Sequence, residues 1–128
     1  MKKNEKGFTL SELLIVVAIV VVLVIIAIPV FSGQLHKSRV ATDMANVRSY
    51  YSQLQYDFLE NGYDETVVNA KPYGSTEFEL GGQTIKLEEG VFGVAPEYDD
   101  NVKRGKIIGY NVLYSCNKGD CTLMLPQD

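Results

Sequence analysis

Every residue from Leu13 to Phe31 is apolar. As an α-helix this run would be roughly 28 Å long, at about 1.5 Å per residue, which is close to the hydrocarbon thickness of a bilayer. The run can therefore cross a membrane as a single helix. A carboxylate, Glu12, stands directly before it. A charge at the border of an apolar span costs free energy when it is desolvated, so its presence there calls for a physical reason.

Charge is unevenly distributed along the chain. Residues 1–7 hold three lysines and one glutamate, whereas the whole chain carries a net charge of −4. The basic start predicts that the amino end stays cytoplasmic and that the C-terminal part lies outside the membrane. Because the remainder is acidic, we predict no nucleic-acid partner, since that affinity comes mainly from lysine and arginine. A cleavable secretory signal is the alternative, but the run is longer than a usual signal core and "AIPVFSG" contains no A-x-A site.

A second helical pattern follows the apolar run. Apolar residues recur at spacings of three and four, which is typical of an amphipathic helix; they are Val40, Met44, Val47, Tyr51, Leu54 and Phe58. This pattern places Asp43 on a different side of the helix. Asn61-Gly62 supplies a helix stop. We therefore predict one helix from about Phe8 to Asn61, with a kink at Pro29, which cannot donate a backbone hydrogen bond.

Beyond Gly62 the pattern changes to strands. "TEFELGGQTIKL" predicts a hairpin that turns at Gly81-Gly82. "GVFGVA", "KIIGYNVLYS" and "CTLML" predict further strands, with "PEYDDNVKRG" as a polar loop and residues 61–75 as a loop between helix and sheet. The predicted fold class is α+β. A long N-terminal helix, transmembrane in its first half and amphipathic in its second, packs on a small C-terminal antiparallel sheet.

The two cysteines enclose the turn "CNKGDC". This turn would place Cys116 and Cys121 opposite each other on adjacent strands, on the side of the membrane where disulfides persist. We predict a disulfide, which contributes about 2 kcal/mol for so short a loop. No metal site is expected, because the chain offers only one histidine besides this pair. No cofactor or catalytic residue is expected either, because the sequence has no nucleophile motif and no phosphate-binding glycine loop.

The stretch "K-G-F-T-L-S-E", followed by the apolar run, resembles the class III signal of type IV pilins and related pilin-like proteins. The resemblance covers about the first 60 residues and extends through "IAIPVF", where the family often carries a proline at the position of Pro29. It implies cleavage by a prepilin peptidase after Gly7, methylation of the new amino terminus at Phe8, and a role for Glu12 in assembly. The stretch "ATDMANVRSYY" looks like pilins of low-GC Gram-positive bacteria. "T-L-S-E" also fits a capping box formed by Thr9 and Glu12.

This resemblance implies a structural subunit of a type IV pilus, not an enzyme. Its parts would be a leader (residues 1–7), a transmembrane and filament-core helix (8–31), the amphipathic half of the helix (32–61) and a β-rich head (62–128). The precursor would sit in the membrane with a cytoplasmic leader and an extracytoplasmic head, and the mature form would lie in an extracellular homo-oligomeric filament. Implied partners are the prepilin peptidase, an inner-membrane platform protein and assembly ATPases.

Physics gives a reason for Glu12 in such a filament. If cleavage produces an amine at Phe8, the carboxylate of a neighbouring subunit can pair with it among apolar helices, where an unpaired charge is heavily penalised. Three rival functions remain: a pseudopilin of type II secretion, a competence pilin for DNA uptake, and a signal-anchored binding domain that never polymerises. The first two share the filament and differ in what it does.

Overall fold

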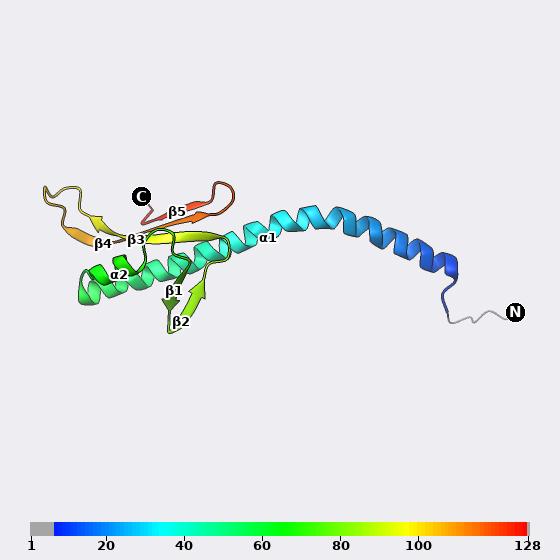
Figure 1. Cartoon of the computed structure of the whole chain (residues 1–128), viewed down its shortest axis with the longest axis horizontal. Helices are drawn as coiled ribbons and strands as arrows, with labels where there is room; N and C mark the ends of the chain where they lie inside the picture. Colours follow the sequence, from blue (N-terminus) through cyan, green and yellow to red (C-terminus); the bar gives the residue numbers. More distant parts are fainter. Residues whose placement is uncertain (1–6, 128) are drawn as a thin grey trace. The chain divides into compact units, whose positions relative to one another are not determined.

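The computed structural model describes residues 7–127 (Figure 1). The elements in chain order are α1 (Leu10–Asn61), α2 (Glu65–Ala70), β1 (Glu77–Leu80), β2 (Gln83–Lys86), β3 (Gly90–Tyr98), β4 (Ile107–Cys116) and β5 (Thr122–Leu125). The chain forms two compact units that divide after His36. The predicted α+β class is confirmed, with a long N-terminal apolar helix and small antiparallel sheets. The predicted leader, apart from Gly7, lies outside the described residues.

The long predicted helix is confirmed and begins two residues later than expected, at Leu10. It ends where Gly62 adopts a φ of 80°, a conformation that favours glycine. The N–H of Gly62 donates to the carbonyl of Phe58 at 2.8 Å and so satisfies one of the last helical acceptors. The helix continues through Pro29. Three residues later, the Ser32 hydroxyl donates to the carbonyl of Ile28 at 3.0 Å.

The strands form two antiparallel sheets where we expected one. β1 and β2 form the predicted hairpin, with Leu80 opposite Gln83. Its two turn residues, Gly81 and Gly82, have φ values of 58° and 80°, the positive pair that a tight two-residue turn requires. β3, β4 and β5 form the second sheet in that order. An isolated bridge joins Ser75 to Phe92 on β3.

Two expectations for the loops are wrong. The segment between α1 and β1 contains α2, which Asp64 begins by accepting hydrogen bonds from the backbone N–H of Thr66 at 2.9 Å and from its hydroxyl at 2.6 Å. The polar loop after β3 is also shorter than predicted, because β3 continues through Pro96 to Tyr98.

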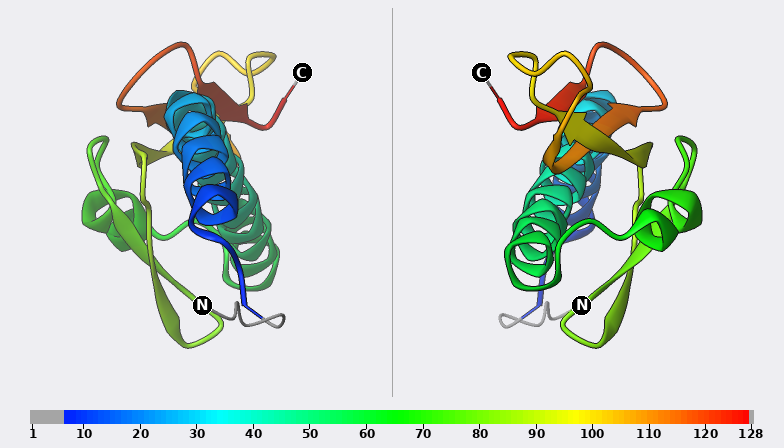
Figure 2. Two further views of the ribbon diagram at one scale, coloured as in Figure 1. Left: turned by 90° about the vertical axis from the view of Figure 1, so that its right-hand side faces the viewer. Right: turned by 90° about the vertical axis from the view of Figure 1, so that its left-hand side faces the viewer.

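The core of the second unit lies between the helix and the strands. In Figure 2 the three-stranded sheet covers one side of the part of α1 that belongs to the second unit. α2 and the β1–β2 hairpin lie beside the same part of the helix. Three aromatic side chains meet at its centre: Tyr50 stacks on Phe78 at 4.5 Å between ring centroids, and Phe78 meets Phe92 edge-on at 5.3 Å. Such contacts stabilise a small core beyond the area they bury. The fully buried face of the helix includes Val47, Tyr50 and Leu54.

Candidate assembly site at the start of the long helix

The first turn of α1 is closed by a reciprocal pair of hydrogen bonds. The backbone N–H of Thr9 donates to Glu12 Oε2 at 3.0 Å, and the backbone N–H of Glu12 donates to Thr9 Oγ1 at 3.3 Å. The hydroxyls of Thr9 and Ser11 also lie within hydrogen-bond distance, at 3.2 Å. This is the capping box that the sequence allowed, and it satisfies two N–H groups that the helix cannot satisfy itself.

The capping box fixes where the Glu12 carboxylate lies. Bonding to the Thr9 N–H draws it towards the amino end of the helix, where an anion is favoured by the helix dipole. Only Oε2 is used in this bond, so the second oxygen remains able to accept. Gly7 and Phe8 precede the helix and are exposed, Phe8 to 87%. The peptide bond between them is therefore not protected by helical structure.

The apolar run after Glu12 is uncovered in the single chain. Its large side chains are between 49% and 67% exposed from Leu13 to Phe31. Within the described part of the chain, α1 is the helix that is long and apolar enough to cross a membrane, and none of its most apolar window is buried. An apolar surface this extended requires lipid or other protein to cover it. Pro29 lies inside this run and is compatible with the helix there.

The predicted disulfide is present. Cys116 and Cys121 are bonded with their Cα atoms 5.4 Å apart, and both cysteines of the chain are used. The N–H of Cys116 donates to the carbonyl of Cys121 at 2.9 Å, so the pair faces across the β4–β5 ladder as expected. Gly119 in the enclosed turn has a φ of 89°, which favours glycine. The disulfide closes the hairpin far along the chain from the start of the helix.

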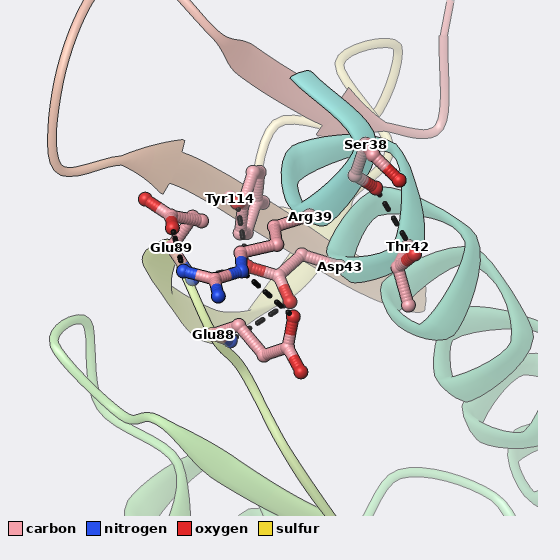
Figure 3. Close-up of polar contacts among 7 residues, drawn as sticks. All are labelled: Ser38, Arg39, Thr42, Asp43, Glu88, Glu89 and Tyr114. Atoms are coloured by element: carbon pink, nitrogen blue, oxygen red, sulfur yellow. Dashed lines mark hydrogen bonds and ion pairs between the residues drawn. The ribbon is translucent and has the colours of Figure 1, made fainter. Parts of the chain in front are cut away.

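One buried charge was not predicted from the helical pattern. Asp43, expected on a different side from the apolar stripe, is 1% exposed. Its Oδ1 accepts from the N–H of Glu88 at 2.9 Å, and its Oδ2 accepts from the N–H of Glu89 at 2.8 Å and from the Tyr114 hydroxyl at 2.9 Å (Figure 3). One turn earlier on the helix, Arg39 pairs with the side chains of Glu88 and Glu89 at 3.9 and 3.3 Å. These contacts join α1 to the two residues just before β3 and to β4.

The pKa of Tyr114 is raised above its usual value of 10.0. Burial is the main cause, and the hydrogen bond to Asp43 and the negative charges of Asp43 and Glu89 add to it. Because the hydroxyl donates to a carboxylate, ionising it would place two negative charges in contact. Asp43, Glu88, Glu89 and Tyr114 form what we call the Asp43 cluster. Its contacts keep the tyrosine protonated and hold the helix on the sheet.

A second polar contact joins α1 to β4. β5 pairs with β4 only between Val112 and Ser115, so Tyr110 lies beyond its reach. The N–H of Tyr110 donates instead to Gln55 Oε1 at 3.0 Å, and Gln55 Nε2 donates to the Tyr51 hydroxyl at 3.1 Å. A buried backbone donor must find such a partner. Like the Asp43 cluster, this contact supports the fold and leaves the start of the helix as the candidate functional site.

Comparison with known proteins points to the same end of the chain. Residues 2–28 match the prokaryotic N-terminal methylation motif. Two fimbrial proteins of Pseudomonas aeruginosa are each 34% identical to the chain over 88 residues, which is 69% of this chain and 55% of the relative. The chain thus spans about half the length of the curated relatives it matches. No solved structure matches it significantly.

Proposed function

We propose that this chain, a type IV pilin-like protein and not an enzyme, is the structural subunit of a type IV pilus. Cleavage after Gly7 gives a mature chain that begins at Phe8 and carries a methyl group on its amine. Copies of the mature chain then polymerise through α1 into an extracellular filament that serves motility, adhesion or aggregation. A prepilin peptidase, a platform protein of the inner membrane and assembly ATPases are the proposed partners.

The observation that carries this proposal is the uncovered apolar helix with Glu12 at its start. The large side chains of the run from Leu13 to Phe31 are left exposed by the part of the chain that the structure describes. Lipid can cover it in the precursor, since the prepilin-type motif and the apolar helix fit a membrane-anchored protein. In a filament the same surface is covered by the helices of neighbouring copies, and the contact is heterologous and propagates without closing.

Glu12 supplies the register of this packing. Among apolar helices a carboxylate without a partner is strongly disfavoured, so the amine of Phe8 in a neighbouring copy stabilises one axial position over the others. The capping box holds the carboxylate at the amino end of its own helix, where such an amine approaches. Pro29 would allow the middle of the run to adjust, because it already lacks one helical hydrogen bond.

Replacing Glu12 by glutamine separates assembly from capping. Glutamine can accept the bond from the Thr9 N–H and so preserve the start of the helix, but it carries no charge. We expect Glu12→Gln to insert into the membrane at wild-type level and to yield few or no sheared filaments. The matched control is Thr9→Ala, which removes a capping partner and keeps the charge; it should still form filaments.

Intact-mass analysis of the purified subunit tests the processing steps. The mature protein should lack residues 1–7 and carry one additional methyl group at Phe8. A subunit that retains the leader, or begins at another residue, would refute the proposed maturation. Normal piliation by Glu12→Gln would refute the pairing role while leaving the maturation intact.

A further inference from the structure

One face of the second unit's helix segment is exposed along its whole length. From residue 38 onward the side chains opposite the core are small, and two large apolar side chains follow at its end. Tyr56 is 61% exposed and Leu59 is 82% exposed. The small residues of this face, with spacings of three and four, are Ser38, Ala41, Ala45, Ser49 and Ser52.

Three hydroxyls on or beside this face donate hydrogen bonds within the helix. Thr42 donates to the carbonyl of Ser38 at 3.0 Å, Ser49 to Ala45 at 3.1 Å and Ser52 to Arg48 at 3.1 Å. These groups need no hydrogen-bond partner from outside as donors, so covering them costs little. Small side chains also allow the backbone of another helix to come close.

Opposite charges border the two edges of this face. Viewed down the helix axis, successive residues are about 100° apart. Lys37 and Arg48 therefore lie about 20° apart, on one edge of the face. Asp57 lies about 180° from Arg48 and Glu60 about 120° from it, on the other edge. All four side chains are exposed. Among the described residues, the structure gives Arg48 and Glu60 no side-chain hydrogen bond or ion pair. By contrast Arg39, on the acidic edge, is already engaged by Glu88 and Glu89.

We infer that this face of α1 docks a second copy of the chain in parallel orientation, with the basic edge of one copy against the acidic edge of the next. This inference rests on the proposed filament and adds a contact outside the apolar run. The two edges differ, so each copy offers one edge to each of two neighbours and the contact propagates. Charge complementarity selects the parallel neighbour and disfavours like-charged alignments.

The pairing also sets the displacement between neighbours. Arg48 lies nine residues before Asp57 and twelve before Glu60. At 1.5 Å per residue, copies that pair these side chains are displaced along the helix by about 14 to 18 Å. Tyr56 and Leu59 then pack beside the small residues of the neighbouring helix, which covers the two most exposed apolar side chains of this segment.

A charge exchange on the full chain tests the contact. We expect Arg48→Glu and Glu60→Arg each to lower the yield of sheared filaments by roughly tenfold or more, because each places like charges together. The double variant should recover most of the yield. Lys103→Glu, which makes the same change of charge on an exposed loop residue, is the control and should leave the yield unchanged.

Cross-linking provides an independent measurement. Filaments of the Arg48→Cys, Glu60→Cys variant, treated with a short bis-maleimide, should give a ladder of covalent oligomers. The Lys103→Cys, Glu60→Cys variant should give none. If the wild-type chain forms no filaments, the proposed function fails and this contact fails with it. If wild-type filaments form but Arg48→Glu is unaffected, or if the ladder is missing, the contact alone is refuted.

Discussion

Asp43→Asn should strongly destabilise the folded head, although the substitution hardly changes the shape of the side chain. In the wild type the carboxylate accepts three hydrogen bonds, from the N–H groups of Glu88 and Glu89 and from the Tyr114 hydroxyl. The asparagine oxygen can take over the Oδ2 bonds to Glu89 and Tyr114, but its NH₂ group then faces the Glu88 N–H. Leaving that buried donor unsatisfied costs about 1 to 3 kcal/mol.

The remaining bonds also weaken, because a hydrogen bond to a charged acceptor contributes roughly 1.5 to 3 kcal/mol and a neutral one about 1 kcal/mol. Removing the charge also relieves repulsion from the side chains of Glu88 and Glu89. That gain is small, since Arg39 already compensates these partly exposed groups and such pairs contribute about 0 to 1 kcal/mol. The net loss is about 3 kcal/mol, a large part of the stability of a small domain.

The assay is urea unfolding of the mature full chain in detergent micelles, followed by the near-ultraviolet circular dichroism of the buried tyrosines. With a urea dependence of about 1 to 3 kcal/mol per molar, the midpoint should fall by roughly 1 to 3 M. The matched control is Asp57→Asn, the same substitution at an exposed position of the same helix. It should change stability by less than about 0.5 kcal/mol. Equal midpoints for the two variants would refute the role assigned to the buried carboxylate.

Two further predictions concern the head. Non-reducing thiol labelling should find no reactive cysteine, and replacing Cys116 and Cys121 by serine should cost about 2 kcal/mol in the same urea assay; labelling of two thiols in the native chain would contradict the bridge. The raised pKa of Tyr114 makes stability depend on pH, because the folded state holds this proton more tightly than the unfolded state. Its contribution is fully present below the unfolded value of 10.0 and is lost as pH rises through the folded value. Tyr114→Phe should therefore lose less stability than the wild type above about pH 10, and equal alkaline losses would contradict this origin.

Local patterns in the sequence predicted the long helix and the β1–β2 hairpin, because periodicity and turn glycines act within a few residues. The missed helix α2 has only six residues, too few for a periodic pattern. Its one signal was Asp64, whose carboxylate can cap a helix start. The end of β3 was misplaced because Pro96 usually terminates a strand. β3 lies at the edge of its sheet, where a residue without an N–H is tolerated.

The buried face of the helix was predicted about one residue out of place. The stripe that includes Val40, Val47 and Leu54 was found, but its intermediate positions are Asp43 and Tyr50, with spacings of three, four, three and four. Met44 and Tyr51 lie beside that face and are only partly buried. A charged residue in the favoured register makes a pattern look weaker. Its partners, the N–H groups of residues 88 and 89, are more than 40 positions away, so helical periodicity could not reveal them.

Capping and the proposed assembly role of Glu12 support each other. An isolated carboxylate at the end of a flexible side chain would lose conformational entropy when it paired with a neighbour's amine. The Thr9 N–H already restrains Glu12 in the single chain, so much of that cost falls on folding instead of assembly. Thr9→Ala keeps this backbone N–H and its bond to the carboxylate, so it should leave assembly close to the wild-type level, whereas Glu12→Gln removes the attraction itself. If Thr9→Ala, which keeps the charge, lost filaments to the same extent as Glu12→Gln, assembly would depend on the start of the helix and not on the charge, and the pairing role would be refuted.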